Sequence, residues 1–80
     1  MKDYSDTVHI CQSIQLAAGS VLSEILNTPE LLEVPAYREL VERIYMAARQ
    51  SATVSRVIGD DRTARFTDSV CDKLVSTANL

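Results

Sequence analysis

Prolines, and a glycine followed by two aspartates, interrupt this 80-residue chain at two places, which constrain its fold more than any other feature. Pro29 and Pro35 lie close together, and Gly59 stands directly before Asp60 and Asp61. The stretches between them repeat apolar residues every three or four positions and show no alternating run, which predicts helices rather than strands. The expected helices span residues 6–27, 35–58 and 61–77.

Two long helices of similar length joined by a short link pack most simply as an antiparallel hairpin, with the third helix folded back over it. We therefore predict an all-α, three-helix fold in which residues 1–80 form a single domain. The link over residues 28–34 is left open as either a helical turn or a loop. At 100° per residue each helix carries one apolar arc that should face the core. The predicted arcs are Ile10, Cys11, Ile14, Ala18, Val21, Leu22 and Ile25; then Tyr37, Leu40, Val41, Ile44, Ala47, Ala48, Ser51, Ser55 and Ile58; and finally Phe66, Val70, Leu74 and Ala78.

Small residues gather at the midpoints of both long helices. In an antiparallel hairpin the segment 17–20 lies opposite Ala47–Ala48 and Ser51–Ala52. Side chains of this size allow two helix axes to approach closely. Glycine in mid-helix costs about 1 kcal/mol relative to alanine, and a close approach of the second helix offers a reason for Gly19.

The first predicted helix carries almost no charge. Between Thr7 and Asn27 the only formally charged side chain is Glu24, and Leu16 lies near the centre of the face opposite the apolar arc. Protein interfaces are depleted of Lys, Glu and Asp, whereas solvated helix faces are normally charged. We therefore predict a small non-enzymatic interaction module that self-associates or docks on a larger protein, as an adaptor, inhibitor or assembly subunit. The expected contact residues are Gln12, Leu16, Ser20 and Ser23.

An arginine stripe supports a second interpretation. On the second helix Arg38, Arg49 and Arg56 project within about 20° of one another, and Tyr45 borders the same stripe. Guanidinium groups bind carboxylates and phosphates well, and tyrosine can stack on a ring. An oligomer could thus hold a small anionic ligand such as a nucleotide at these four residues. The competing interpretation is a solvated face in which Arg38 pairs with Glu42.

Residues 52–62, with the sequence ATVSRVIGDDR, resemble the recognition helix and following loop of lactose-repressor-family headpieces. In that family such a T-V-S-R-V segment reads the DNA major groove. The resemblance implies a helix-turn-helix regulator in which Thr53, Ser55 and Arg56 contact DNA. Whether residues 46–58 form one continuous helix or a helix-turn-helix is left open by the sequence.

Charge and composition argue against several other functions. Eight basic and eleven acidic side chains give a net charge of −3, which opposes a nucleic-acid partner because phosphate neutralisation dominates such binding. No run approaches the 18 apolar residues of a membrane span. Cys11 and Cys71 are too few for a disulfide framework, so we expect free thiols in a reducing cytoplasm. One histidine, without metal-ligand spacing or a Gly-rich phosphate loop, predicts no metal, no cofactor and no catalytic residue.

Overall fold

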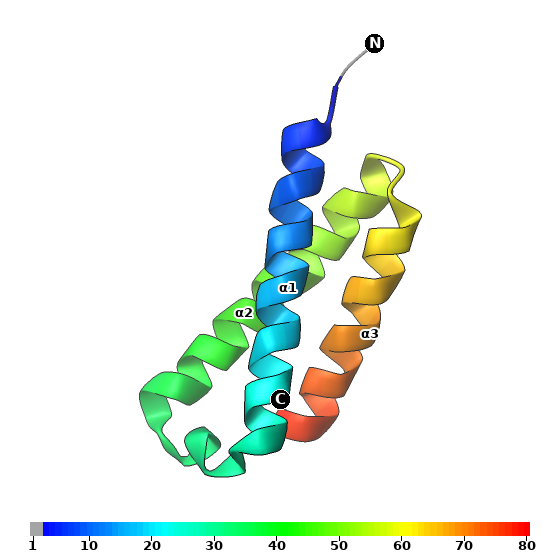
Figure 1. The fold of residues 1–80 in the computed structure, drawn as a ribbon. Helices are drawn as coiled ribbons and strands as arrows, with labels where there is room; N and C mark the ends of the chain where they lie inside the picture. The colour runs from blue at the N-terminus through cyan, green and yellow to red at the C-terminus, as the bar shows by residue number, and fades with distance from the viewer. Residues whose placement is uncertain (1–2) are drawn as a thin grey trace.

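The computed structural model describes residues 3–80 and confirms an all-α fold of three long helices without strands over that range. The chain runs down, up and down along one bundle, so α1 and α2 form the predicted hairpin and α3 lies beside both (Figure 1). The link between the hairpin helices is a short 3₁₀ turn, which settles the open choice over residues 28–34. The elements are α1 (Ser5–Asn27), η1 (Pro29–Glu33), α2 (Pro35–Val57) and α3 (Asp61–Ala78).

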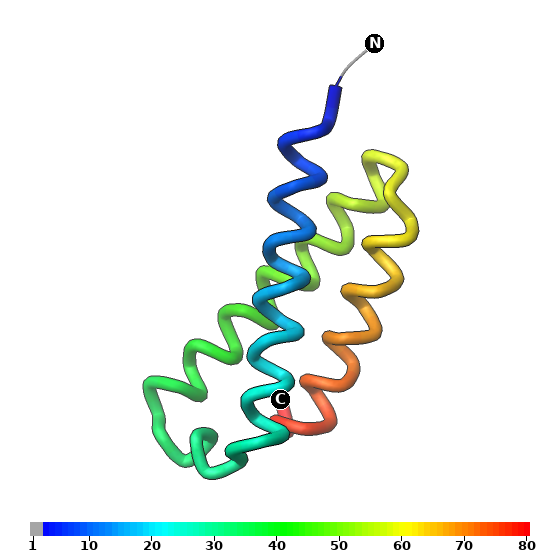
Figure 2. Tube along the Cα trace, in the orientation of Figure 1, coloured from blue at the N-terminus to red at the C-terminus, as the bar shows by residue number. Residues whose placement is uncertain are grey.

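The turn between α2 and α3 is stabilised by capping interactions at both helix ends. Gly59 adopts a left-handed φ of 86°, which a residue without a Cβ tolerates at a helix end. The backbone N–H of Asp60 donates to the carbonyl of Ser55 at 2.8 Å. The Asp60 carboxylate in turn accepts a hydrogen bond from the backbone N–H of Thr63 at 3.2 Å and caps α3. The chain therefore reverses sharply here and brings α3 back along α2, as the tube in Figure 2 shows.

The most deeply buried positions recur every seven residues in all three helices. Each of these side chains is at most 3% exposed. A strict seven-residue repeat favours helices that wrap around one another in a left-handed supercoil. The bundle that results is a rod with principal extents of 48 × 19 × 17 Å. The repeats are Cys11, Ala18 and Ile25 in α1; Val41, Ala48 and Ser55 in α2; and Ala64, Cys71 and Ala78 in α3.

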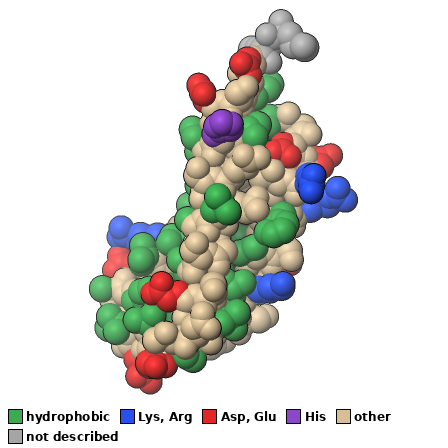
Figure 3. All heavy atoms as spheres, viewed as in Figure 1, with side chains coloured by type: hydrophobic (Ala, Val, Ile, Leu, Met, Phe, Trp, Pro, Cys, Tyr) green, Lys and Arg blue, Asp and Glu red, His purple; other side chains and the backbone are tan. Residues whose placement is uncertain are grey.

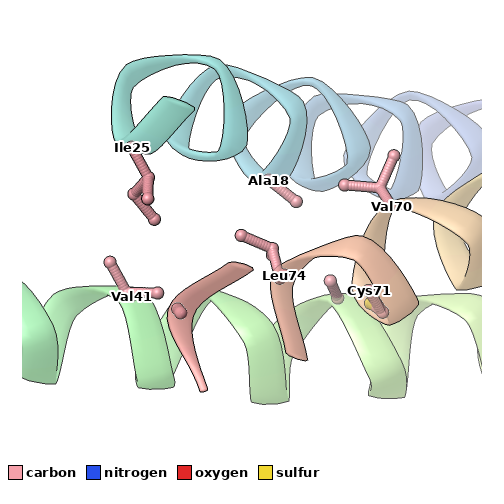
Figure 4. Close-up of a cluster of buried hydrophobic side chains, with 8 residues drawn as sticks. Ala18, Ile25, Val41, Val70, Cys71 and Leu74 are labelled. Carbon is pink, nitrogen blue, oxygen red and sulfur yellow. The ribbon is translucent and has the colours of Figure 1, made fainter. Parts of the chain in front are cut away.

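Large apolar side chains fill one half of the core. Ile25 of α1 and Val41 of α2 point toward each other, and Leu74 reaches from α3 toward α1 (Figure 4). All three are essentially inaccessible to solvent. Because burial of each such side chain contributes roughly 1.5–3 kcal/mol, this half supplies most of the hydrophobic stabilisation.

The middle of the bundle is built from small residues, as the sequence predicts, but Gly19 has no part in it. Ala18, Ala48 and Cys71 are fully buried in the same cluster and give the three helices room to approach. A Cβ added at Gly19, in contrast, would meet no atom within 4 Å. The expectation that a neighbouring helix explains this glycine is therefore wrong, because α2 and α3 leave its outer side open.

The other half of the core, near the α2–α3 turn, is polar. Ser51, Ser55, Thr63 and Thr67 are buried there. Among the described residues the hydroxyls of Ser51, Ser55 and Thr67 have no hydrogen-bond partner. An unsatisfied buried hydroxyl costs about 1–3 kcal/mol. These hydroxyls offset part of the stabilisation that burial gives to this half of the bundle.

In the two hairpin helices, two residues assigned to the core from helical spacing are exposed instead. Ile10 is 60% exposed and Leu40 is 48% exposed. Each directly precedes a buried residue, Cys11 or Val41 respectively, and so lies about 100° away from it around the helix. The two side chains border the core face rather than belonging to it.

Candidate interaction surface

The outer face of α1 holds all four residues predicted as partner contacts. His9, Leu16 and Ser23 are seven residues apart and lie opposite the buried series of α1. Leu16 is 68% exposed at the centre of the row. Gln12 and Ser20 flank it and are exposed as well. The structure thus brings the four together around a solvent-facing leucine, while their role in binding stays a prediction.

This face is uncharged over nearly four helical turns. No residue between His9 and Glu24 of α1 is charged. In the space-filling view, hydrophobic and neutral polar atoms form a band along α1 from the single histidine downward, and charged groups lie toward the edges and ends (Figure 3). We name this band, residues 9–23 on the outer side of α1, the neutral face.

A groove of about 460 Å³ runs beside the neutral face, between α1 and the first turns of α3. Phe66 is among its lining residues and is 59% exposed, so its assignment to the core was wrong. The i, i+4 series that begins at Phe66 rotates by about 40° at each step, which places Phe66 about 120° from Ala78. That drift was the available signal that Phe66 is a surface residue. The groove is lined by Gln12, Gln15, Leu16, Asp60, Arg62, Thr63 and Phe66.

The arginine stripe of α2 borders α3, and its side chains are partly exposed. Arg49 donates to the Tyr45 hydroxyl at 3.1 Å, to Asp72 at 2.8 Å and to Asp68 at 3.3 Å. Its guanidinium carbon also lies 5.3 Å from the centroid of the Tyr45 ring. The hydrogen bonds to Tyr45 and then Asp72 raise the pKa of Arg49, so its charge is permanent.

The other two stripe arginines also bond to α3 and its C-terminal end. Arg56 forms an ion pair with Asp68. Arg38 donates to the backbone carbonyls of Ala78 at 3.0 Å and Asn79 at 3.3 Å, where a cation also complements the C-terminal helix dipole. All three guanidinium groups therefore have oxygen partners within the chain. An anionic ligand at the stripe would compete with Asp68 and Asp72 for Arg49 and Arg56.

We expect Arg49→Met to lower the free energy of unfolding by about 1 kcal/mol. The substitution removes two hydrogen bonds from α2 to α3 and one within α2, and it leaves the half-buried Asp68 with a single cation. Arg43→Met is the matched control, because Arg43 pairs only with Glu39 on an exposed surface of α2. That variant should change the free energy by less than about 0.5 kcal/mol. Urea denaturation compares the two, and equal losses would show that the network adds nothing.

The segment that resembles a DNA-recognition helix has a different setting here. α2 continues without a break to Val57, so residues 46–57 contain no helix-turn-helix. Ser55 is fully buried, and the implied DNA contact of its side chain is therefore wrong. Arg56 is bonded to Asp68. Thr53 is exposed, and its hydroxyl donates to the backbone carbonyl of Arg49 at 3.3 Å.

The two cysteines are free and buried, as predicted. Burial raises the pKa of the Cys71 thiol, which therefore stays protonated and unreactive. Within residues 3–80, no group of three or more His, Cys, Asp or Glu side chains is placed to hold a metal ion. Over the same range no helix has the length and apolarity needed to span a membrane.

No protein-family model matches the chain, and no curated protein or solved structure is significantly similar to it. The interpretation of the surface therefore rests on its own geometry. That geometry joins an uncharged helix face and a groove containing an exposed phenylalanine, whereas the partly exposed arginines of the alternative site are bonded to α3 and its C-terminal end.

Proposed function

We propose that this protein is a self-associating helical interaction module, an assembly subunit without catalytic activity, whose contact surface is the neutral face of α1. The observation that carries the proposal is Leu16, which is 68% exposed at the centre of a face free of charge. Exposure of this leucine to water is unfavourable, so a partner that covers it gains binding free energy from the hydrophobic effect. In this proposal the chain acts in a reducing cytoplasm, which the two free thiols support.

The lack of charge favours a second copy as the partner. A two-fold contact sets the same patch of both subunits together, so a strongly charged face would oppose like charges. Each copy carries a net charge of −3, and two copies repel one another unless their carboxylates stay apart. The neutral face is where two copies can meet without that penalty.

The area available suits a reversible dimer. The chain exposes 5330 Å² of surface, whereas a compact 8.8 kDa protein is expected to expose roughly 4800 Å². The elongated bundle therefore has surface to spare for a contact with a partner. α1 is about 34 Å long and the bundle is 19 Å across. One side therefore offers on the order of 600 Å² per copy, which is at the small end of specific interfaces.

Leu16→Glu tests the proposal directly. Light scattering over a concentration series from micromolar to millimolar should give the wild-type protein twice its monomer mass of 8.8 kDa at the upper end. The variant should stay monomeric, because the pairing would bury two carboxylates against an apolar surface. Far-UV circular dichroism should report unchanged helix content, since Leu16 makes little contact with the core.

Met46→Glu is the matched control, because Met46 is 58% exposed on the outer side of α2 and lies outside the neutral face. This variant adds the same charge and should dimerise as the wild type does. A wild-type protein that remains monomeric up to millimolar concentration would overturn the proposal. So would a Leu16→Glu variant with undiminished association.

A further inference from the structure

We infer that two copies pair antiparallel across the groove between α1 and α3, so that Phe66 of each copy packs over Gly19 of the other. This inference rests on the proposed self-association and adds the orientation and the residues that meet. Two unexplained features of the fold support it: a glycine in mid-helix with open space above it, and an aromatic side chain left in solvent beside it.

Gly19 is the first of these features. Glycine weakens a helix interior relative to alanine, so a packing or functional reason is expected for it. Residues 3–80 offer none, because a Cβ at this position would have no neighbour among them within 4 Å. An atom group from outside the chain is then the remaining candidate for a close approach to this backbone. Gly19 is flanked by Ser20 and lies one turn before Ser23, so the surface around it is low and uncharged.

Phe66 is the second feature. It is the only phenylalanine of the chain and is 59% exposed. It lines the groove together with Gln12 and Leu16 and forms a large apolar projection beside the neutral face. Buried aromatic side chains dominate the energetics of interfaces and pack into pockets of the partner. Phe66 needs a surface of a partner to pack on, and the low, uncharged surface at Gly19 leaves room for its ring.

The positions of the two features select the orientation. Phe66 lies beside the turn that contains Gln12 and Leu16, and Gly19 begins the next turn of α1. A two-fold axis that crosses α1 near Leu16 reverses the helix direction and exchanges these two levels. Phe66 of one copy then lies above Gly19 of the other, and both Leu16 side chains are covered near the axis. A parallel pairing would instead set equal levels together and leave Gly19 empty.

Cysteine cross-linking tests this arrangement. Gly19→Cys and Phe66→Cys are made as separate variants, and each is oxidised alone and as an equal mixture. Antiparallel pairing should give a covalent dimer in the mixture and little in either variant alone. The native Cys11 and Cys71 are buried, so the wild-type protein should give none and serves as the background control.

Gly19→Ala provides an independent test, because it should stabilise the monomer and weaken the dimer. Below the dimer dissociation constant the variant should melt about 4–8 °C higher than the wild type, because alanine is the better helix former. Its dimer should nevertheless be weaker by about tenfold, since the added methyl group occupies the space for Phe66. Phe66→Ser should weaken the dimer by at least as much, and Val57→Ser, at an exposed valine of α2, should not.

The outcomes separate the two proposals. A monomeric wild-type protein would overturn both of them. A wild-type dimer that Leu16→Glu dissociates, but that forms no 19–66 cross-link in the mixture, would leave the module standing and overturn the antiparallel pairing. Cross-links confined to the single variants would point to parallel chains and would also overturn it.

Discussion

Leu74→Ala is expected to lower the free energy of unfolding by about 3 kcal/mol, since truncation of a buried leucine costs about 2–5 kcal/mol. Leu74 is fully buried, and it reaches from α3 toward α1 near Ile25 and Ala18 (Figure 4). Its removal leaves a cavity in the half of the core that holds the large side chains. The polar half, where three hydroxyls lack partners among the described residues, has little reserve to offset the loss.

The effect should be large against the total stability, which is about 4–12 kcal/mol for a domain of this length. The midpoint of thermal unfolding should fall by roughly 15 °C. Leu26→Ala makes the same substitution at a leucine of α1 that is 63% exposed, and it should shift the free energy by no more than about 0.5 kcal/mol. Similar losses from Leu74→Ala and Leu26→Ala in urea titrations would mean that the core is not organised around Leu74.

The helices themselves could be predicted because their ends depend on local chemistry. Pro29, Pro35 and the Gly59–Asp60 pair act within a few residues, and the observed bounds agree with the expected ones to within one residue. The core face of α1 and α2 was predicted through the buried series of both helices, whereas that of α3 was harder to predict. The i, i+4 series from Phe66 drifts around α3, whereas the true series through Ala64, Cys71 and Ala78 consists of small residues that carry little hydrophobic signal.

The two candidate sites differ in the same way. The neutral face is defined by the lack of charged residues within one helix, so it can be recognised from the sequence alone. The arginine stripe could also be recognised, but its partners Asp68 and Asp72 belong to α3, and no pattern within α2 indicates which face of α3 it meets. Gly19 required the structure as well, because only the positions of α2 and α3 show that the space above it is open.

Ala48→Leu is expected to destabilise the fold almost as much as Leu74→Ala, by about 2–3 kcal/mol. Ala48 is fully buried and belongs to the same core cluster as Ala18 and Cys71. A leucine adds three carbon atoms where the helices approach closely, so the helices must separate and lose contacts along the whole bundle.

Hydrophobicity alone predicts the opposite sign for this substitution, which makes it informative about how closely the three helices pack. Ala17→Leu is the control, because it adds the same atoms at an exposed position of α1, and its effect should stay within about 0.5 kcal/mol. Urea denaturation at a concentration below dimer formation measures both variants. If Ala48→Leu matched or exceeded the stability of the wild type, the middle of the bundle would have to contain unfilled space, and close packing of Ala18, Ala48 and Cys71 would be refuted.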